Sequence, residues 1–475
     1  MKMRDPRTVL MGTNLETQMG RGPLMSFTWQ EAAFDVLGEG SFGLGTYTSH
    51  DLQYMNHADY SNHVSKYMPD DADVGGDRDR VFRPSTTLNI IYGEDIDSGA
   101  LQKTIGPFDH KRTNDMNHFQ ILAEGEVIVN GRSSGSFRKY DMKTDTTIWT
   151  CGGAFGNFTL IDLDGTVIEP GIAYHARNET PKLLFDGQHN LEYFGVNDAG
   201  LHEYYMFNNG YNQQADSFIQ PNSRPMKLVL DEVALTANIT WAYETGVRSY
   251  IYGDADRLPT GNVLACYWPI ELSVNMPEQF DAKVIEIVPD ESGAGEDVLA
   301  WELLIIGHNC TFGHVGREDG TGCTRASVLD TVPMGWSMYS VERFYMAPLA
   351  IDAKLVAKDS NGEESTLCIA DGATNDDDVA FSDDDSVTVS FTAYDSFKRN
   401  LPSVGKWWLE LSDGDHSEVL AHDYVEFKAH WKPTPVSFNL TTAALNKKDF
   451  QTNATWTLLI QDVAGLDNRS VALEC

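Results

Sequence analysis

Apolar and polar residues alternate along this chain in short runs, and turn residues interrupt the runs every few positions. The runs at 127–130, 204–207 and 226–230 are apolar or alternating, and Gly, Asn, Asp and Pro lie between such runs. Short runs with this period are typical of β-strands, whereas an amphipathic helix places its apolar residues three or four positions apart. The pattern therefore predicts an all-β fold.

A repeated segment gives the most information about architecture. The sequence His-Asp-Leu-Gln-Tyr at 50–54 returns as His-Asn-Leu-Glu-Tyr at 189–193, and His-Phe-Gln-Ile-Leu at 118–122 begins in the same way. Later anchors are followed by further strand-like runs that lead to a tryptophan. Near-equal spacings of 68, 71 and 65 residues separate the four anchors, which are His50, His118, His189 and Asp254.

Such a repeat predicts one structural unit used several times. A unit of three or four strands cannot bury both faces alone, but units arranged radially bury them against each other, as the blades of a β-propeller do. A solenoid would also give repeats, although its period is usually shorter and more regular. We expect residues 1–338 to form a propeller of about six blades.

The repeat stops near residue 338, where a second domain is expected to begin. Residues 339–475 are expected to form an antiparallel, immunoglobulin-like β-sandwich. Its strands are expected at 349–357, 387–393, 407–411, 424–430, 436–440 and 456–461.

The charge of the chain restricts its partners. With 35 basic and 70 acidic residues, the net charge is −35, which disfavours binding to nucleic acid or to an anionic membrane. No apolar run approaches the ~18 residues that a membrane span needs, and Glu302 interrupts the most apolar stretch, at 298–306. The first ten residues lack the apolar core of a secretion signal. We expect no membrane span in this sequence.

Cysteines and glycosylation acceptors point to a compartment. The chain has six cysteines without metal-finger spacing, and Cys310 and Cys323 flank a glycine-rich loop that a disulfide could close. Free thiols and unused acceptors are the alternative. The combination predicts an extracellular or secretory-pathway lumenal protein that can carry N-linked glycans. The Asn-X-Ser/Thr acceptors are Asn157, Asn178, Asn238, Asn309, Asn439, Asn453 and Asn468.

Three histidines at matched repeat positions are the candidates for chemistry. The innermost strands of propeller blades line one channel, so His50, His118 and His189 are expected to converge there. Three imidazoles suit either a catalytic zinc or nucleophilic catalysis, in which one imidazole attacks and another donates a proton. Arg132 and Arg224 lie at related places after two of these histidines. Because guanidinium repels a metal cation and binds sulfate or phosphate, the set favours an anionic ester over zinc.

The sequence also resembles a known family, the arylsulfate sulfotransferases, over about residues 46–301. The resemblance is specific in combination and weak in any single motif. It rests on Asp-Met-Asn-His at 115–118, Val-Ile-Val-Asn-Gly-Arg at 127–132, Phe-Arg-Lys-Tyr-Asp at 137–141, Gly-Gln-His-Asn-Leu-Glu at 187–192, Ser-Arg-Pro-Met-Lys-Leu at 223–228 and Gly-Asp-Ala-Asp-Arg-Leu-Pro-Thr-Gly-Asn-Val-Leu at 253–264.

The resemblance implies a function and roles for residues. It implies a six-bladed propeller that moves a sulfuryl group from an aryl sulfate to a phenol through a sulfated histidine, without a metal or nucleotide cofactor. His189 matches the histidine that takes the sulfuryl group. His118 and Arg132 match its companions, and His50 matches the remaining histidine. Arg224 is expected to help bind the substrate.

Two other functions remain open on the sequence alone. An acidic, glycosylated propeller with a sandwich could be an extracellular scaffold or adhesion protein with an inert channel, because a fold does not determine a function. A zinc-dependent hydrolase is the third possibility. Metal analysis would separate the hydrolase from the sulfotransferase, and an assay with an aryl sulfate would separate the sulfotransferase from the scaffold.

Overall fold

The computed structural model consists of β-strands joined by turns. No α-helix occurs in the residues that it describes, and two short 3₁₀ turns occur, η3 (Ala123–Gly125) and η5 (Ala429–Trp431). No helical segment there has the length and apolarity needed to cross a membrane. The all-β prediction is confirmed. The described residues are 2–5, 8–12, 24–28, 33–36, 53–55, 80–85, 89–95, 101–109, 115–171, 184–212, 217–249, 251–268, 282–290, 295–305, 338–358, 364–370, 386–412, 417–440, 455–462 and 468–474.

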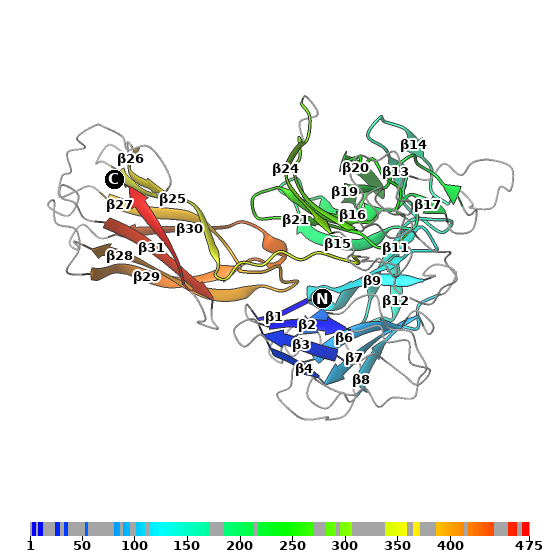
Figure 1. Cartoon of the computed structure of the whole chain (residues 1–475), viewed down its shortest axis with the longest axis horizontal. Helices are drawn as coiled ribbons and strands as arrows, with labels where there is room; N and C mark the ends of the chain where they lie inside the picture. Colours follow the sequence, from blue (N-terminus) through cyan, green and yellow to red (C-terminus); the bar gives the residue numbers. More distant parts are fainter. Residues whose placement is uncertain are drawn as a thin grey trace, which may run out of the picture. The chain divides into compact units, whose positions relative to one another are not determined.

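The chain divides into two compact units (Figure 1). The first consists of Met1–Arg4 and Thr8–Glu342, and the second of Asp5–Arg7 and Arg343–Cys475. The sequence predicts the boundary between residues 338 and 339.

Consecutive sheets make up the first unit, and their strand pairs are antiparallel except for the parallel pair of β13 (Thr159–Ile161) with β20 (Thr236–Ala242). Among the described residues there are four sheets of four strands, one of six strands and one short pair. The first sheet contains β1 (Lys2–Asp5), β2 (Thr8–Gly12), β3 (Leu24–Thr28) and β4 (Ala33–Val36); the second contains β5 (Gln53–Met55), β6 (Arg80–Ser85), β7 (Ile90–Asp95) and β8 (Leu101–Ile105); the third contains β9 (Met116–Ile121), β10 (Glu126–Gly131), β11 (Ser136–Asp141) and β12 (Thr146–Gly152).

The fourth and fifth sheets follow the same plan. The fourth contains β15 (His189–Val196), β16 (His202–Asn208), β19 (Arg224–Asp231) and β20 (Thr236–Ala242), with β13 (Thr159–Ile161) and β14 (Val167–Ile168) added beyond β20. The short pair is β17 (Tyr211–Asn212) and β18 (Ser217–Phe218). The fifth contains β21 (Asp254–Arg257), β22 (Val263–Tyr267), β23 (Ala282–Val288) and β24 (Val298–Ile305).

The sequence repeat corresponds to a repeated local structure. Two anchors open the first strand of a sheet, His189 in β15 and Asp254 in β21, and His118 is the third residue of β9. Asp141 at the end of β11 accepts hydrogen bonds from the amides two and three residues later, and Asp231 at the end of β19 does the same. These side chains close equivalent turns in the third and fourth sheets.

Amide side chains join the first strands of successive sheets. Gln53 on β5 accepts from the Ile121 amide (2.8 Å) and donates to the Ile121 carbonyl (3.3 Å). Gln120 on β9 makes the same pair of bonds with Tyr193 on β15, at 2.7 and 3.1 Å. Each glutamine bonds to the residue that follows the equivalent position in the next sheet: Ile121 follows Gln120, and Tyr193 follows Glu192. Glu192 is therefore the third residue of this series, after Gln53 and Gln120. We call the Gln53 and Gln120 arrangements amide clamps.

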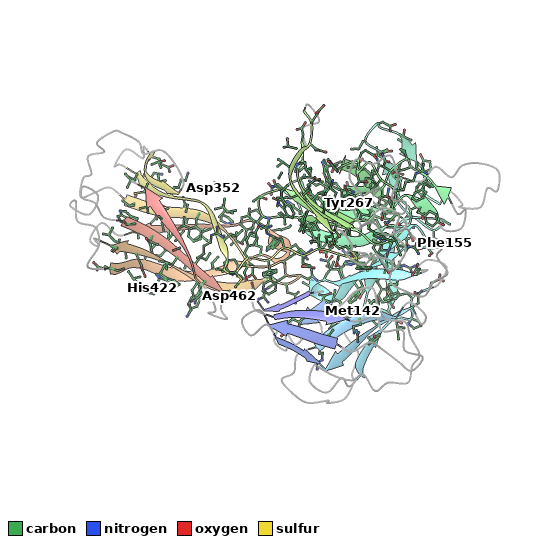
Figure 2. The ribbon with its side chains drawn as sticks, viewed as in Figure 1. Met142, Phe155, Tyr267, Asp352, His422 and Asp462 are labelled. Carbon is green, nitrogen blue, oxygen red and sulfur yellow. The ribbon has the colours of Figure 1, made fainter. Side chains whose placement is uncertain are left out.

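Aromatic side chains fill the space between neighbouring sheets. The core shared by the third and fourth sheets includes Phe137, Trp149 and Tyr204, with the Phe137 and Tyr204 ring centroids 5.4 Å apart. Between the fourth and fifth sheets, Phe207 stacks on Tyr267 at 6.0 Å and 12° (Tyr267 is labelled in Figure 2). The first strands β9 and β15 are neighbours, as are β15 and β21.

In the described part of the second unit, eight strands follow one hydrogen-bonded order, β29-β28-β31-β32-β26-β25-β27-β30. Only two residue pairs join β26 to β32, which leaves two halves of four strands. Trp407 on β28 contacts Phe391 on β27 and Phe438 on β30, so the halves share a core. The strands are β25 (Leu349–Lys358), β26 (Glu364–Ala370), β27 (Ser386–Tyr394), β28 (Ser403–Ser412), β29 (Ser417–Phe427), β30 (Thr434–Leu440), β31 (Thr455–Asp462) and β32 (Asn468–Glu474).

The strand expected at 424–430 is wrong in its bounds. β29 begins at Ser417 and ends at Phe427, and residues 429–431 form η5. His430 has a φ of 59°, which a strand does not accommodate. The first half of β29 does not alternate between buried and exposed positions, because Val419 is exposed and Ala421 is its first buried residue, so its sequence gives no strand period.

Candidate active site

The structure describes four of the five predicted site residues. His50 lies outside the described residues. His118 in β9 is 2% exposed and His189 in β15 is 1% exposed, and both are therefore buried on neighbouring strands. Arg132 directly follows β10, and Arg224 opens β19.

The β-bulges near His189 and His118 differ in position: the extra residue of β15 comes after His189, whereas the extra residue of β9, Asn117, comes directly before His118. The pairing of β9 with β10 runs without interruption from His118 to Ile121, whereas β15 has one extra residue between His189 and Glu192 relative to β16. Asn190 lies in this bulge with a φ of 43°. Because side chains alternate along a strand, one extra residue redirects those before it, so the two histidines are not in equivalent registers.

His189 lies among polar and aromatic groups. Its Nδ1 is 2.7 Å from Oδ1 of Asn209, the residue that follows β16. The rings of Tyr252 and Tyr339 approach the imidazole edge to face, with centroids 6.1 and 6.0 Å away and interplanar angles of 81°. The two tyrosine rings are 5.2 Å apart. His189 is therefore enclosed by aromatic rings and bound through Nδ1.

Arg132 forms an ion pair next to this cluster. Its Nη1 is 3.0 Å from Oδ2 of Asp115, and its backbone amide donates to the Asp115 carbonyl at 3.0 Å. Burial raises the pKa of Tyr252, the charge of Arg132 partly offsets this rise, and Asp115 adds to it. Tyr252 thus contacts the His189 ring and lies within the electrostatic reach of the Arg132 guanidinium.

Arg224 has other partners. It lies on β19, two strands from β15 in the sheet. Its Nη1 is 3.6 Å from Oε1 of Glu244, and its Nη2 is 3.9 Å from Oδ1 of Asp162. The structure pairs Arg224 with carboxylates and shows no contact with His189 in the described part of the chain.

A segment beyond the last sheet covers His189. Tyr339 donates from its hydroxyl to the Asn117 carbonyl, and its own carbonyl accepts from the amide of Gly253 (3.1 Å) and from the side chain of Asn190 (3.3 Å). The Val341 amide donates to Oδ2 of Asp254 at 3.0 Å. Residues 338–342, which we call the strap, therefore run across the beginnings of β9, β15 and β21.

Sequence reasoning missed Asn209, Tyr252 and Tyr339. The repeat holds a signal for the first, because an Asn-Gly pair occurs at this point in both sheets: Asn130 and Gly131 are the last two residues of β10, and Asn209 and Gly210 directly follow β16. Asn130 at the end of β10 donates to the Gln188 carbonyl of the next sheet at 3.0 Å, much as Asn209 reaches the fifth sheet. No pattern indicates the contact between residues 189 and 339.

One group of carboxylates within the described ranges has the geometry of metal ligands. Oxygen atoms of Glu192, Asp256 and Glu342 lie within 4.8 Å of one another. The group contains neither His118 nor His189. Glu192 on β15 is equivalent to Gln53 and Gln120 of the amide clamps. Between β15 and its neighbour β21, a carboxylate therefore takes the place of the amide.

The predicted acceptors and cysteines have different settings. Asn157 and Asn439 are exposed, whereas Asn238 is half-buried in β20, which pairs with strands on both sides. Asn468 opens β32. Burial raises the pKa values of the free thiols of Cys151 and Cys266. The remaining predicted positions lie outside the described residues, namely Asn178, Asn309, Asn453, Cys310 and Cys323.

Comparisons with known proteins do not identify the chain. The sequence matches no family model and no curated protein. Its structure is similar to the nidogen/laminin complex (TM-score 0.33, 6% identity, covering 63% of this chain and 80% of that chain). It is also similar to a putative 6-phosphogluconolactonase from Bacteroides fragilis (TM-score 0.30, 12% identity, covering 64% and 83%). These scores are too low to support an argument about fold family or function.

Proposed function

We propose that this protein is an arylsulfate sulfotransferase that transfers a sulfuryl group from an aryl sulfate to a phenol through His189. The observation that carries the proposal is that Tyr252 contacts the His189 imidazole and also lies within the electrostatic reach of the Arg132 guanidinium. A nucleophile and a group that binds sulfate oxygens thus have a common neighbour. Arg224 has no part in this proposal because it lies two strands from β15 and, among the described residues, no contact links it to His189. The Arg132 guanidinium, by contrast, acts electrostatically on Tyr252, which contacts His189.

The proposed reaction has two steps. Nε2 of His189 attacks sulfur, the bond from sulfur to the aryl oxygen breaks, and the phenolate leaves with a proton from His118. Arg132 stabilises the charge on the non-bridging oxygens. A phenol then attacks the sulfated imidazole and gives its proton to His118, which regenerates neutral His189. No metal or nucleotide takes part in either step.

The proposal includes the architecture. We infer that the first unit is a β-propeller with about six blades, which is supported by consecutive four-stranded sheets whose first strands are neighbours. We infer that the second is an immunoglobulin-like sandwich, supported by two halves that share the core around Trp407. Exposed acceptors at Asn157 and Asn439 are compatible with a glycosylated extracellular or lumenal protein.

A specific observation favours the scaffold as a second candidate. His118 and His189 are 2% and 1% exposed, so a donor cannot reach Nε2 with the strap in its present place. The sulfotransferase therefore requires the strap to move, whereas a scaffold does not. Activity decides between the two candidates.

The test uses a chromogenic aryl sulfate as donor and a phenol as acceptor. His189→Ala should lower transfer by at least about 100-fold, because a covalent step loses its nucleophile. His422→Ala is the matched control, because His422 is exposed on β29 of the second unit (labelled in Figure 2). Mass spectrometry after donor treatment should find a sulfated peptide containing residue 189. Full activity in His189→Ala would refute the mechanism, and an inactive wild-type protein would favour the scaffold.

A further inference from the structure

We propose that Asn209 is a positioning residue that holds His189 in the tautomer with a proton on Nδ1 and a lone pair on Nε2. The inference deepens the proposed function, because its catalytic meaning depends on His189 as the nucleophile. The tautomer itself can be measured whether or not the protein is a transferase.

The surroundings of Asn209 fix which way its amide points. Nδ2 donates to the Ser249 carbonyl at 2.9 Å and to the Tyr252 carbonyl at 3.0 Å. Both partners can only accept, so a rotated amide would place its oxygen against two other oxygens. The amide oxygen must therefore face His189.

The backbone of Asn209 is held as firmly. Ser223 donates from its hydroxyl to the Asn209 carbonyl at 2.8 Å, and the same hydroxyl accepts from the Ser249 amide at 2.8 Å. Asn209 is fully buried. These bonds anchor it between the fourth sheet and the beginning of the fifth, so its Oδ1 presents a fixed acceptor to the imidazole.

An acceptor at 2.7 Å determines the tautomer. An amide oxygen cannot donate, so Nδ1 of His189 must carry the hydrogen of this bond. In a neutral imidazole the other nitrogen then has the lone pair. Nε2 is accordingly the nitrogen available for attack on sulfur, and after attack the same bond stabilises the positive ring.

An amide also differs from a carboxylate in charge. A carboxylate at this distance would favour the imidazolium, which has no lone pair for attack, whereas an amide fixes orientation without adding charge. Tyr252 and Tyr339 flank the ring as neutral phenols, and Asp115 and Arg132 lie beyond Tyr252 as an ion pair. The chain has a net charge of −35, but the amide that accepts from Nδ1 adds no negative charge next to the imidazole.

The first test measures the tautomer directly. We expect the full-length protein, labelled with ¹⁵N-histidine, to show one histidine with protonated Nδ1 and bare Nε2 near neutral pH. Among 13 histidines, the signal is assigned by its loss in His189→Gln. A proton on Nε2 alone, or on both nitrogens, would overturn the inference. Because no turnover is needed, this result is independent of the proposed reaction.

The second test uses Asn209→Asp. A carboxylate should raise the pKa of the His189 imidazolium, so the signal of neutral His189 should appear at a pH about 1–3 units higher than in the wild type. If the protein is active, the acidic limb of its rate profile should move upward by a similar amount, because attack needs the neutral ring. The matched control is Asn89→Asp, at a buried asparagine that directly precedes β7 and whose Nδ2 donates to the Phe108 carbonyl. An unshifted titration in a folded Asn209→Asp protein would refute the role of Asn209.

Discussion

The amide clamp between β9 and β15 allows a quantitative prediction for Gln120→Ala. Gln120 is 2% exposed, and its side chain satisfies the outward-facing amide and carbonyl of Tyr193. Those two groups lie on the side of β15 away from β16, where none of the described strands pairs with them. Alanine would leave both groups without their partner.

The magnitude follows from the two lost bonds. A buried polar group left unsatisfied costs about 1–3 kcal/mol, so two groups cost roughly 2–6 kcal/mol. Water that enters the vacated space recovers part of this energy, and we therefore expect a loss of about 2–4 kcal/mol. Since about 1.4 kcal/mol corresponds to a factor of ten, the Tyr193 amide should exchange with solvent at least about 30 times faster.

Hydrogen exchange resolved by mass spectrometry tests the prediction at the junction itself. This readout is preferable to a single unfolding transition because the chain has two units. Val233→Ala, at a side chain 95% exposed, serves as the control and should change nothing. Glu192→Gln should instead stabilise the next junction, because it removes a charge beside Asp256 and Glu342. Unchanged exchange at Tyr193 in a folded Gln120→Ala protein would show that the clamp contributes no stability.

Two other features give predictions. Tyr339→Leu should loosen the strap and raise the ratio of hydrolysis to transfer of an aryl sulfate, because water then reaches His189. Tyr345→Leu, at a residue beyond the strap, is the control and should leave this ratio unchanged. An equal ratio in both variants would contradict the role of the strap in covering His189. In the antiparallel pairing of β26 with β32, Ile369 pairs with Glu474. Buried Cys368 directly precedes Ile369, and Cys475 directly follows Glu474 in the sequence. We expect a Cys368–Cys475 disulfide, formed in an oxidising compartment and detectable by non-reducing peptide mapping; a free thiol at residue 368 in secreted protein would refute it.

The strands could be predicted because alternation is a local property of the sequence. The runs at 204–207 and 226–230 lie within β16 and β19, and the repeat correctly located successive sheets. The repeat also selects His118 and His189 as candidate site residues, and their roles stay a prediction. The two histidines do lie on neighbouring strands.

The geometry around His189 could not be predicted because it depends on distant contacts. Asn190, in the bulge, has a φ of 43° and donates to the Tyr339 carbonyl, 149 residues away. A sequence repeat treats the histidines as equivalent and does not reveal one extra residue in a strand. The carboxylate partners of Arg224 arise in the same way, because Asp162 and Glu244 approach it only after the fourth sheet forms.

The strap has a practical consequence for dissecting the protein. A fragment that ended at residue 338 would lose the Tyr339 carbonyl, which accepts from both Asn190 and Gly253. It would also lose the Tyr339 ring that packs against the buried imidazole. A fragment that continued through Glu342 would keep every strap bond described above. Four residues at the junction of the two units thus determine whether an isolated first unit would preserve the environment of His189 or expose it to solvent.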